Sequence, residues 1–414
     1  MELKFVSLLG LVVFVGLAWA LSYHRKQFPW RTVLSGLALQ LSFALLILKT
    51  QPGREVFAFA QTAAQKLIEV SIEGAKMVFG PLANEVLLTE KLGPGNAFIF
   101  VVTVSATIIV VSAISALLYH WGVLQLIVRG AAWVMQRVMG TSGSESLAAA
   151  ANIFMGQTEA PLVVRPYLSR MTQSEIMALM TGGMATIAGG VLAAYVSFGM
   201  DAGHLLTASV MSAPAALVMA KILLPETEKS ETAAGASAKV ERETANGLDA
   251  LCHGASEGMK LSLNVMAMLI AFVAVVALAN FLIAWPQRSL GVVDPITLER
   301  LVGWLNAPFA WLLGVPGKDC LAVGQVLGER IVLNEFIGYF TLKDLKETLD
   351  PRSFTIATYA LCGFANFASI AIQIGGIGSL VPSRRADLAK LGLRAMLGGL
   401  LASYLTATIA GLLL

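Results

Sequence analysis

Two short polar clusters interrupt long apolar stretches of this chain. The first comprises Gln157, Thr158 and Glu159 within NIFMGQTEAPLVV. An amide, a hydroxyl and a carboxylate together donate and accept hydrogen bonds, which suits the edge of a flat heterocycle. The alternative is a turn whose polar side chains only satisfy backbone groups left free at helix ends. The triplet therefore predicts either a base-binding site or a capped turn.

The second cluster lies far along the chain, with Asn334 and Glu335 in VLNEF and Asn366 and Ser369 in LCGFANFASIAI. A carboxylate, an amide and a hydroxyl can together hold vicinal sugar hydroxyls, each of which donates and accepts. For Glu335 the alternative is an ion pair with a nearby cation, Arg330 or Lys318.

Other residues near these clusters could complete a site. Phe364 and Val191 could form its apolar walls, although each could equally be an ordinary packing residue. Asn152 and Thr186, with the carbonyl oxygens of Met155 and Ile187, could form a small neutral cage for a cation. The alternative for Asn152 is a hydrogen-bonded helix residue.

The composition places these clusters in a membrane protein. Of the 414 residues, 57% are hydrophobic and 13% are charged, which is typical of a polytopic protein of the bacterial inner membrane. The net charge of +3 comes from Lys and Arg residues that lie between apolar runs. No basic face results, and a nucleic-acid partner is excluded.

Familiar soluble-enzyme motifs are absent from the sequence. The four histidines have no HExxH spacing, and there is neither a GxSxG elbow nor a P-loop. The three cysteines are widely separated and predict no disulfide framework. An apolar run at 5–22 could be a signal peptide, but its length and the basic residues after it favour a retained span.

Eight stretches are long and apolar enough to cross a bilayer. They cover residues 5–22, 32–48, 97–119, 176–198, 205–224, 261–285, 354–379 and 395–414. Basic residues follow the first span and precede the last, so both of these loops should be cytoplasmic and both termini outside. Residues 225–247 are charged and lack apolar periodicity, which predicts a flexible cytoplasmic loop. Residues 123–139 predict either an interfacial helix or a buried one.

Two further apolar regions are too interrupted to span the membrane. Residues 146–168 are broken at 156–161, and residues 321–340 are broken at 328–330 and 334–335. Half-length segments of this kind predict re-entrant hairpins. Each is followed by a span that small and polar residues interrupt, at 182–191 and at 361–372. In the predicted topology the two units are inverted, a pattern typical of transporters with a midplane site and unlike a continuous pore.

Four strings carry a resemblance that extends over nearly the whole chain. AANIFMGQTEAPLVVRPYL, MATIAGGVLAAY, VLNEFIGYF and LCGFANFASIAIQIGGIGSLVPSRR follow one another in this order. They closely resemble the concentrative nucleoside transporter family. The resemblance implies a homotrimer of all-α protomers, each with eight spanning helices, two opposing re-entrant hairpins, two unwound helices and amphipathic interfacial helices.

The resemblance also implies roles for individual residues. Gln157, Thr158 and Glu159, with Val191 beside them, would bind the nucleobase. Glu335, Asn366 and Ser369 would hold the ribose, and Phe364 would line the pocket. Asn152 and Thr186, with the carbonyls of Met155 and Ile187, would ligate sodium. Thr186 stands where related sequences can have serine, which keeps the hydroxyl oxygen.

The predicted function is sodium-driven uptake of nucleosides such as uridine by an elevator-like movement, with membrane lipid around the protein and no cofactor. The chain divides into a scaffold-forming part at 1–140, a first repeat at 141–224, a charged loop and interfacial segment at 225–258, a scaffold helix and periplasmic segment at 259–317, and a second repeat at 318–414. Proton coupling through Glu159 or Glu335 is the nearest alternative. An intramembrane enzyme using both glutamates would lack a nucleophile or metal.

Overall fold

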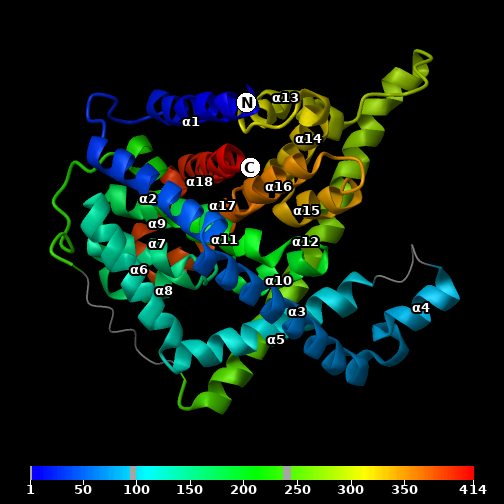
Figure 1. Cartoon of the computed structure of the whole chain (residues 1–414), viewed down its shortest axis with the longest axis horizontal. Helices are drawn as coiled ribbons and strands as arrows, with labels where there is room; N and C mark the ends of the chain where they lie inside the picture. Colours follow the sequence, from blue (N-terminus) through cyan, green and yellow to red (C-terminus); the bar gives the residue numbers. More distant parts are fainter. Residues whose placement is uncertain (1, 94–98, 236–243) are drawn as a thin grey trace.

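The computed structural model describes residues 2–93, 99–235 and 244–414, and these form helices and connecting turns with no strand. Figure 1 shows a helical body from which α3, α4 and α12 extend. The α-helices are α1 (Glu2–Ala20), α2 (Trp30–Lys49), α3 (Gln51–Phe79), α4 (Glu85–Leu92), α5 (Phe100–His120), α6 (Val123–Met139), α7 (Gly143–Ala151), α8 (Ala160–Val163), α9 (Gln173–Ala185), α10 (Gly189–Ser197), α11 (Ala202–Leu223), α12 (Gly247–Ser289), α13 (Leu298–Leu312), α14 (Cys320–Val332), α15 (Glu335–Asp344), α16 (Pro351–Leu361), α17 (Phe367–Leu380) and α18 (Arg385–Leu413).

The all-helical membrane fold is confirmed. Within the described residues, 7 segments are long and apolar enough to cross a membrane, and they correspond to all the predicted spans except 354–379. That stretch is divided between α16 and α17, neither of which is long enough alone. The first residues of the predicted span 97–119 lie outside the described part, where α5 begins at Phe100.

Both predicted helix breaks are present and shorter than expected. The first covers residues 186–188, between α9 and α10, and the second covers 362–366, between α16 and α17. Asn366 restarts the second helix as its N-cap, because its side-chain oxygen accepts a hydrogen bond from the Ser369 backbone N–H at 2.9 Å. At the second break a polar residue therefore provides the capping that an interrupted helix needs, whereas α10 begins after Ala188 without a side-chain cap.

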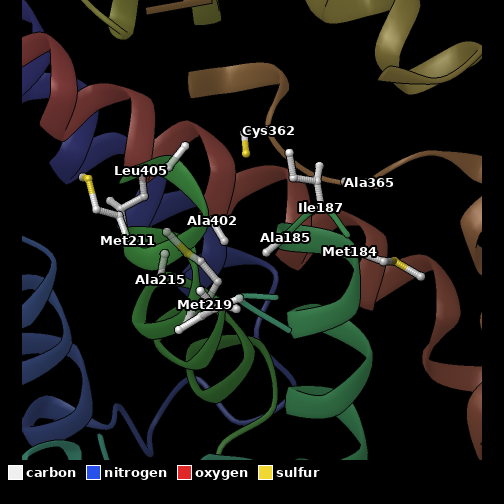
Figure 2. Close-up of a cluster of buried hydrophobic side chains, with 14 of the residues drawn as sticks. Met184, Ala185, Ile187, Met211, Ala215, Met219, Cys362, Ala365, Ala402 and Leu405 are labelled. Carbon is white, nitrogen blue, oxygen red and sulfur yellow. The ribbon is translucent and has the colours of Figure 1, made fainter. Parts of the chain in front are cut away.

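The two breaks meet inside the body. Gly363, in the second break, has a φ of +157°, and a Cβ atom there would lie 2.9 Å from the carbonyl carbon and oxygen of Ala185. Ala185 is the last residue of α9, so a glycine is what lets the second break touch the first. Figure 2 shows Ala185 and Ile187 near Cys362 and Ala365, beside apolar residues of α11 and α18.

A helix–turn–helix segment precedes each broken helix. In the first unit α7 is followed by a turn at 152–159, by α8 and by the 3₁₀ helix η3 (Arg165–Arg170). In the second unit α14 is joined to α15 through Leu333 and Asn334. Each unit then continues with its broken helix and ends in a long helix, α11 or α18. The two units therefore share one order of elements, as the pattern of interruptions predicts.

The ends of the chain and its basic loops agree with the predicted topology. Both termini are at one end of the body, since a Cβ on Gly411 would lie 3.0 Å from the Ser7 hydroxyl oxygen (Figure 1). The guanidinium of Arg394 lies over the Tyr23 ring at 3.5 Å, which brings the two basic loops together. If the chain crosses the membrane an even number of times, its two termini lie on one side, and the first and last loops lie together on the other side.

The segment after α11 differs from the flexible loop predicted at 225–247. Thr232 is 4% exposed, and its carbonyl oxygen accepts a hydrogen bond from the Gly143 N–H at 2.9 Å. Ser230 donates its hydroxyl hydrogen to the Glu175 carboxylate at 2.5 Å. Ser230 and Thr232 therefore dock against the starts of α7 and α9, whereas most of the other residues from 226 to 235 are exposed. Residues 236–243 lie outside the described part.

Helix α6 matches the predicted helix at 123–139 and has two different faces. Its residues Val128, Ala132 and Met135 are buried, whereas Leu126 and Trp133 are exposed. It therefore lies along the surface of the body with one face covered, which favours the interfacial interpretation over a buried helix. The long helix α3 was not predicted as a separate element, because its apolar residues are interspersed with charged ones.

Candidate functional site

The first polar cluster lies on the turn at 152–159 and reaches across to α17. Gln157 is 8% exposed, and its Nε2 donates a hydrogen bond to the Ser369 hydroxyl oxygen at 3.2 Å. Its Oε1 accepts a hydrogen bond from Nε2 of Gln373, also at 3.2 Å. The structure therefore brings together residues from the two repeats that the sequence places more than 200 positions apart.

The carboxylate of Glu335 is held by two donors close to the same place. The Tyr195 hydroxyl donates to Oε1 at 3.1 Å, and Nδ2 of Asn366 donates to Oε2 at 3.0 Å. Glu335 is 4% exposed and has no ion-pair partner within 4.0 Å among the described residues. The alternative ion pairs with Arg330 and Lys318 do not form. A carboxylate fixed in this way still has acceptor capacity for a ligand hydroxyl.

The other residues predicted to contact the base or to form the apolar walls differ in solvent exposure. Thr158 and Glu159 are exposed, and Oε2 of Glu159 accepts a hydrogen bond from the Gly156 N–H at 3.2 Å. Phe364 is half-buried in the second break, whereas Val191 is 1% exposed at the start of α10. Thr158, Glu159 and Phe364 are thus accessible to a ligand, and Val191 is a packed residue in this conformation.

The four predicted cation ligands lie around the first break. Asn152 is 1% exposed, its Nδ2 donates to the Ala148 carbonyl at 3.0 Å, and its Oδ1 is buried without a hydrogen-bond partner among the described residues. The Thr186 hydroxyl donates to the Gly182 carbonyl at 2.9 Å, which leaves its oxygen lone pairs available. The Gly189 N–H donates to the Phe154 carbonyl at 3.1 Å and so joins the break to the turn that contains Met155. A buried amide oxygen without a partner and a hydroxyl oxygen with available lone pairs suit a hard cation of modest charge.

Two adjacent glycines on α9 make room for both parts of the site. A Cβ on Gly182 would lie 3.1 Å from Nδ2 of Asn152. A Cβ on Gly183 would lie 2.6 Å from Nε2 of Gln373 and 2.9 Å from Cβ of Gln157. The GG pair therefore allows the turn at 152–159 to lie directly on α9. Across the turn, a Cβ on Gly376 would lie 3.1 Å from Cγ2 of Thr158, so α17 also packs closely against the turn.

Three buried polar residues at this centre were not predicted from the sequence. Tyr195 and Gln373 donate to Glu335 and Gln157. Arg330 is fully buried and donates to the Ala360 carbonyl, at the end of α16, and to the Ser403 hydroxyl at 3.0 Å. Gln373 follows Ser369 by one helical turn, and this i, i+4 spacing was a signal that could have identified it.

Family models match most of the chain in three parts. Residues 204–411 match "Na+ dependent nucleoside transporter C-terminus" and residues 9–82 match the corresponding N-terminus. Residues 101–202 match "Nucleoside recognition".

Relatives over the full chain include an uncharacterized transporter of Bacillus subtilis, 42% identical over 407 residues and covering 98% of each chain. Sodium/nucleoside cotransporter 2 of Rattus norvegicus is 38% identical over 427 residues, and the alignment covers 99% of this chain and 63% of the rat protein. The chain therefore spans less than two thirds of the length of that animal relative.

Solved structures of CNTnw have the same fold. The inward-facing substrate-bound state of CNTnw aligns with a TM-score of 0.93 and 39% identity over 99% of this chain and 97% of that chain. A double variant of CNTnw in an outward-facing state aligns with a TM-score of 0.94 and 39% identity over the same shares.

These matches decide between the classes of function that the sequence left open. The matched families and structures are transporters, so the intramembrane-enzyme alternative is wrong. The matched family is Na+-dependent, which makes sodium the family's co-transported ion. With one family model covering half of the chain and full-length relatives near 40% identity, the chain belongs to the concentrative nucleoside transporter family.

Proposed function

We propose that this protein is a secondary active symporter that takes up nucleosides by coupling to an inward sodium gradient. The observation that carries the proposal is the polar centre where the two helix breaks meet. There Glu335 is held by Tyr195 and Asn366, and Gln157 is bonded to Ser369. A buried carboxylate, two amides and hydroxyls at membrane depth are costly unless they serve a ligand.

The two sides of this centre suit the two halves of a nucleoside. Gln157, Thr158 and Glu159, with Val191 behind them, would contact the nucleobase. On the opposite side, Glu335, Asn366 and Ser369 would hold the ribose hydroxyls, and Phe364 would cover the sugar or base as an apolar wall. These polar groups can donate and accept as the ribose hydroxyls and base edges require.

For sodium, we propose ligation by Asn152 Oδ1, the Thr186 hydroxyl and the carbonyl oxygens of Met155 and Ile187. The support is the buried Asn152 Oδ1, which has no hydrogen-bond partner among the described residues. An unsatisfied oxygen in an apolar body costs free energy that a bound cation would recover. A proton on Glu159 or Glu335 remains the rival coupling mechanism.

The two repeats would move together against a scaffold that includes α5 and α12. Helix α12 packs mainly against α5. In the single chain only 6% of the residues in its most apolar stretch are buried. So much apolar surface must face lipid or another subunit. As the family resemblance implies, we propose a homotrimer in the bacterial inner membrane, with α7–η3 and α14–α15 as re-entrant hairpins. Inward-facing, intermediate and outward-facing states of CNTnw support an elevator-like movement.

One sodium ion per nucleoside is energetically sufficient. Moving one positive charge through 100 mV releases about 2.3 kcal/mol. That free energy supports roughly a fiftyfold gradient of a neutral solute.

The test is uptake of radiolabelled uridine into proteoliposomes, with inward sodium and inward proton gradients imposed separately and unlabelled adenosine as competitor. We expect accumulation with sodium alone. Accumulation only with protons would move the coupling to Glu159 or Glu335 and overturn the sodium site. If neither gradient drives uptake of a nucleoside panel, the proposed substrate class is wrong.

A further inference from the structure

Gln373 is a fully buried glutamine on α17 that no part of the proposed mechanism yet uses. It lies one turn beyond Ser369 and contacts both α9 and the turn at 152–159. We propose that Gln373 is a positioning residue that fixes which way the Gln157 amide points. The inference rests on the proposed function, because it concerns how Gln157 recognises a nucleobase.

The amide of Gln373 has a defined orientation. Its Nε2 donates to the Met180 carbonyl oxygen at 3.1 Å. A backbone carbonyl can only accept, so the opposite orientation would place two acceptor oxygens against each other. The assignment of nitrogen and oxygen, which is ambiguous for an isolated amide, is therefore decided here by a backbone atom.

This orientation is passed on to Gln157. The same Nε2 lies 3.2 Å from Oε1 of Gln157, which makes that oxygen the acceptor. The Gln157 nitrogen must then be directed away from Gln373, and it donates to the Ser369 hydroxyl at 3.2 Å. Of its two N–H hydrogens, one is used by Ser369 and the other is available to a ligand.

The arrangement is rigid because the neighbouring elements enclose it. Gln373 is 0% exposed, and Gly183 leaves space for the pair that any larger residue would fill. Oε1 of Gln373 is buried without a hydrogen-bond partner among the described residues. The chain thus tolerates one unsatisfied oxygen in order to keep both Gln373 donor bonds, which indicates that the donor direction matters.

A directed donor gives the site a preference among nucleobases. The free N–H of Gln157 can donate to a base carbonyl or to an unprotonated ring nitrogen. If the base has an amino group at that position, two donors face each other and no hydrogen bond forms. Sites that supply a fixed hydrogen-bonding group reject analogues that lack its partner. We therefore expect the protein to select nucleosides with an acceptor at the edge that faces Gln157.

The test is an acceptor scan in proteoliposomes that contain the full-length protein. Uridine analogues that lack the 4-oxygen or lack the 2-oxygen compete with radiolabelled uridine. In the wild type, removing one of these acceptors should raise the inhibition constant about five- to tenfold, the cost of one hydrogen bond. In Gln373→Met the same penalty should fall below about threefold, since Gln157 can then turn either way.

Three controls isolate the positioning role. Gln325→Met removes a glutamine that donates to Glu329 on α14, outside the site, and should keep the wild-type penalty. In a Gln157→Met background, Gln373→Met should have no further effect, because the two residues act as one unit. Gln373→Asn provides a second variant if Gln373→Met does not fold. Its shorter amide cannot reach both Gln157 Oε1 and the Met180 carbonyl oxygen. This variant should therefore also lose the difference in inhibition constant between uridine and the analogues.

Two results would overturn the inference about Gln373: no acceptor penalty in the wild type, or a penalty that is unchanged in the folded Gln373 variants. A purely structural role would reduce maximal uptake of all analogues equally and leave their ratios intact. Failure of the wild type to take up any nucleoside would instead overturn the proposed function, on which this inference rests.

Discussion

Replacement of Glu335 by glutamine should abolish most nucleoside binding while the protein still folds and inserts. The substitution keeps the length and shape of the side chain and removes its charge. Glutamine can still accept from Nδ2 of Asn366 through its oxygen, and its amide nitrogen can donate to Tyr195, whose hydroxyl also accepts. Both contacts therefore persist and protect the fold, although the buried Tyr195 hydroxyl hydrogen loses its acceptor.

The expected loss follows from the hydrogen bonds that the carboxylate makes. A hydrogen bond to a charged group contributes about 1.5–3 kcal/mol, against about 0.5–1.5 kcal/mol for a neutral pair. In the proposed complex two ribose hydroxyls donate to the carboxylate, and each bond would lose about 1–1.5 kcal/mol. A total near 2–3 kcal/mol weakens uridine binding about 30- to 150-fold.

Calorimetric titration of the purified protein with uridine in sodium buffer, together with initial uptake rates, measures this loss. The matched control is Glu299→Gln. Glu299 also accepts from an asparagine, Asn280, at 2.9 and 3.0 Å, but it lies outside the site. We expect the control to bind uridine within about twofold of the wild type. Near-normal affinity in folded Glu335→Gln would remove Glu335 from the binding site.

Three further substitutions test the sodium site, the close packing on α9 and the buried ion pair. Asn152→Ala should raise the sodium concentration for half-maximal uptake at least about tenfold, measured as a sodium titration; an unchanged titration would contradict the proposed ligand. Gly183→Ala places a Cβ 2.6 Å from an amide nitrogen and should raise the KM for uridine about fivefold, whereas Gly375→Ala, with open space around it, should not. Lys221 Nζ lies 2.6 Å from a carboxylate oxygen of the buried Glu145, so Lys221→Met leaves that carboxylate without this ion-pair partner. It should cost about 3–5 kcal/mol, seen as a lower Tm, whereas Lys260→Met at an exposed pair should leave the Tm nearly unchanged.

The sequence was sufficient to predict where the helices break. Gln157, Thr158 and Glu159 interrupt an apolar run that is too short to span a membrane, and a polar interruption in lipid requires an internal partner. The same argument located Glu335 and Asn366, and the structure brings them within hydrogen-bonding distance. The order hairpin, broken helix and long helix could likewise be derived from lengths and interruptions alone.

The partners of these residues could not be predicted in the same way. Tyr195 gives no indication of the direction it faces, and the only signal for Gln373 is its i, i+4 spacing from Ser369. Their roles depend on how α10 and α17 are rotated, which packing between distant elements determines. The docked segment around Thr232 was missed for a related reason: its hydroxyls lie against Glu175 only because α7 and α9 begin at the same place.

The same geometry explains how sodium and nucleoside could depend on each other. Asn152 and Gln157 belong to one short turn, and they contact neighbouring residues of α9, Gly182 and Gly183. A cation bound to Asn152 would hold that turn against α9, which is the position in which Gln157 meets Gln373 and Ser369. Because coupling between two sites is reciprocal, a bound nucleoside must tighten sodium binding by the factor by which sodium tightens nucleoside binding. Gly183→Ala should weaken this coupling even though it leaves every sodium ligand in place, and binding titrations of each solute with and without the other would measure both factors.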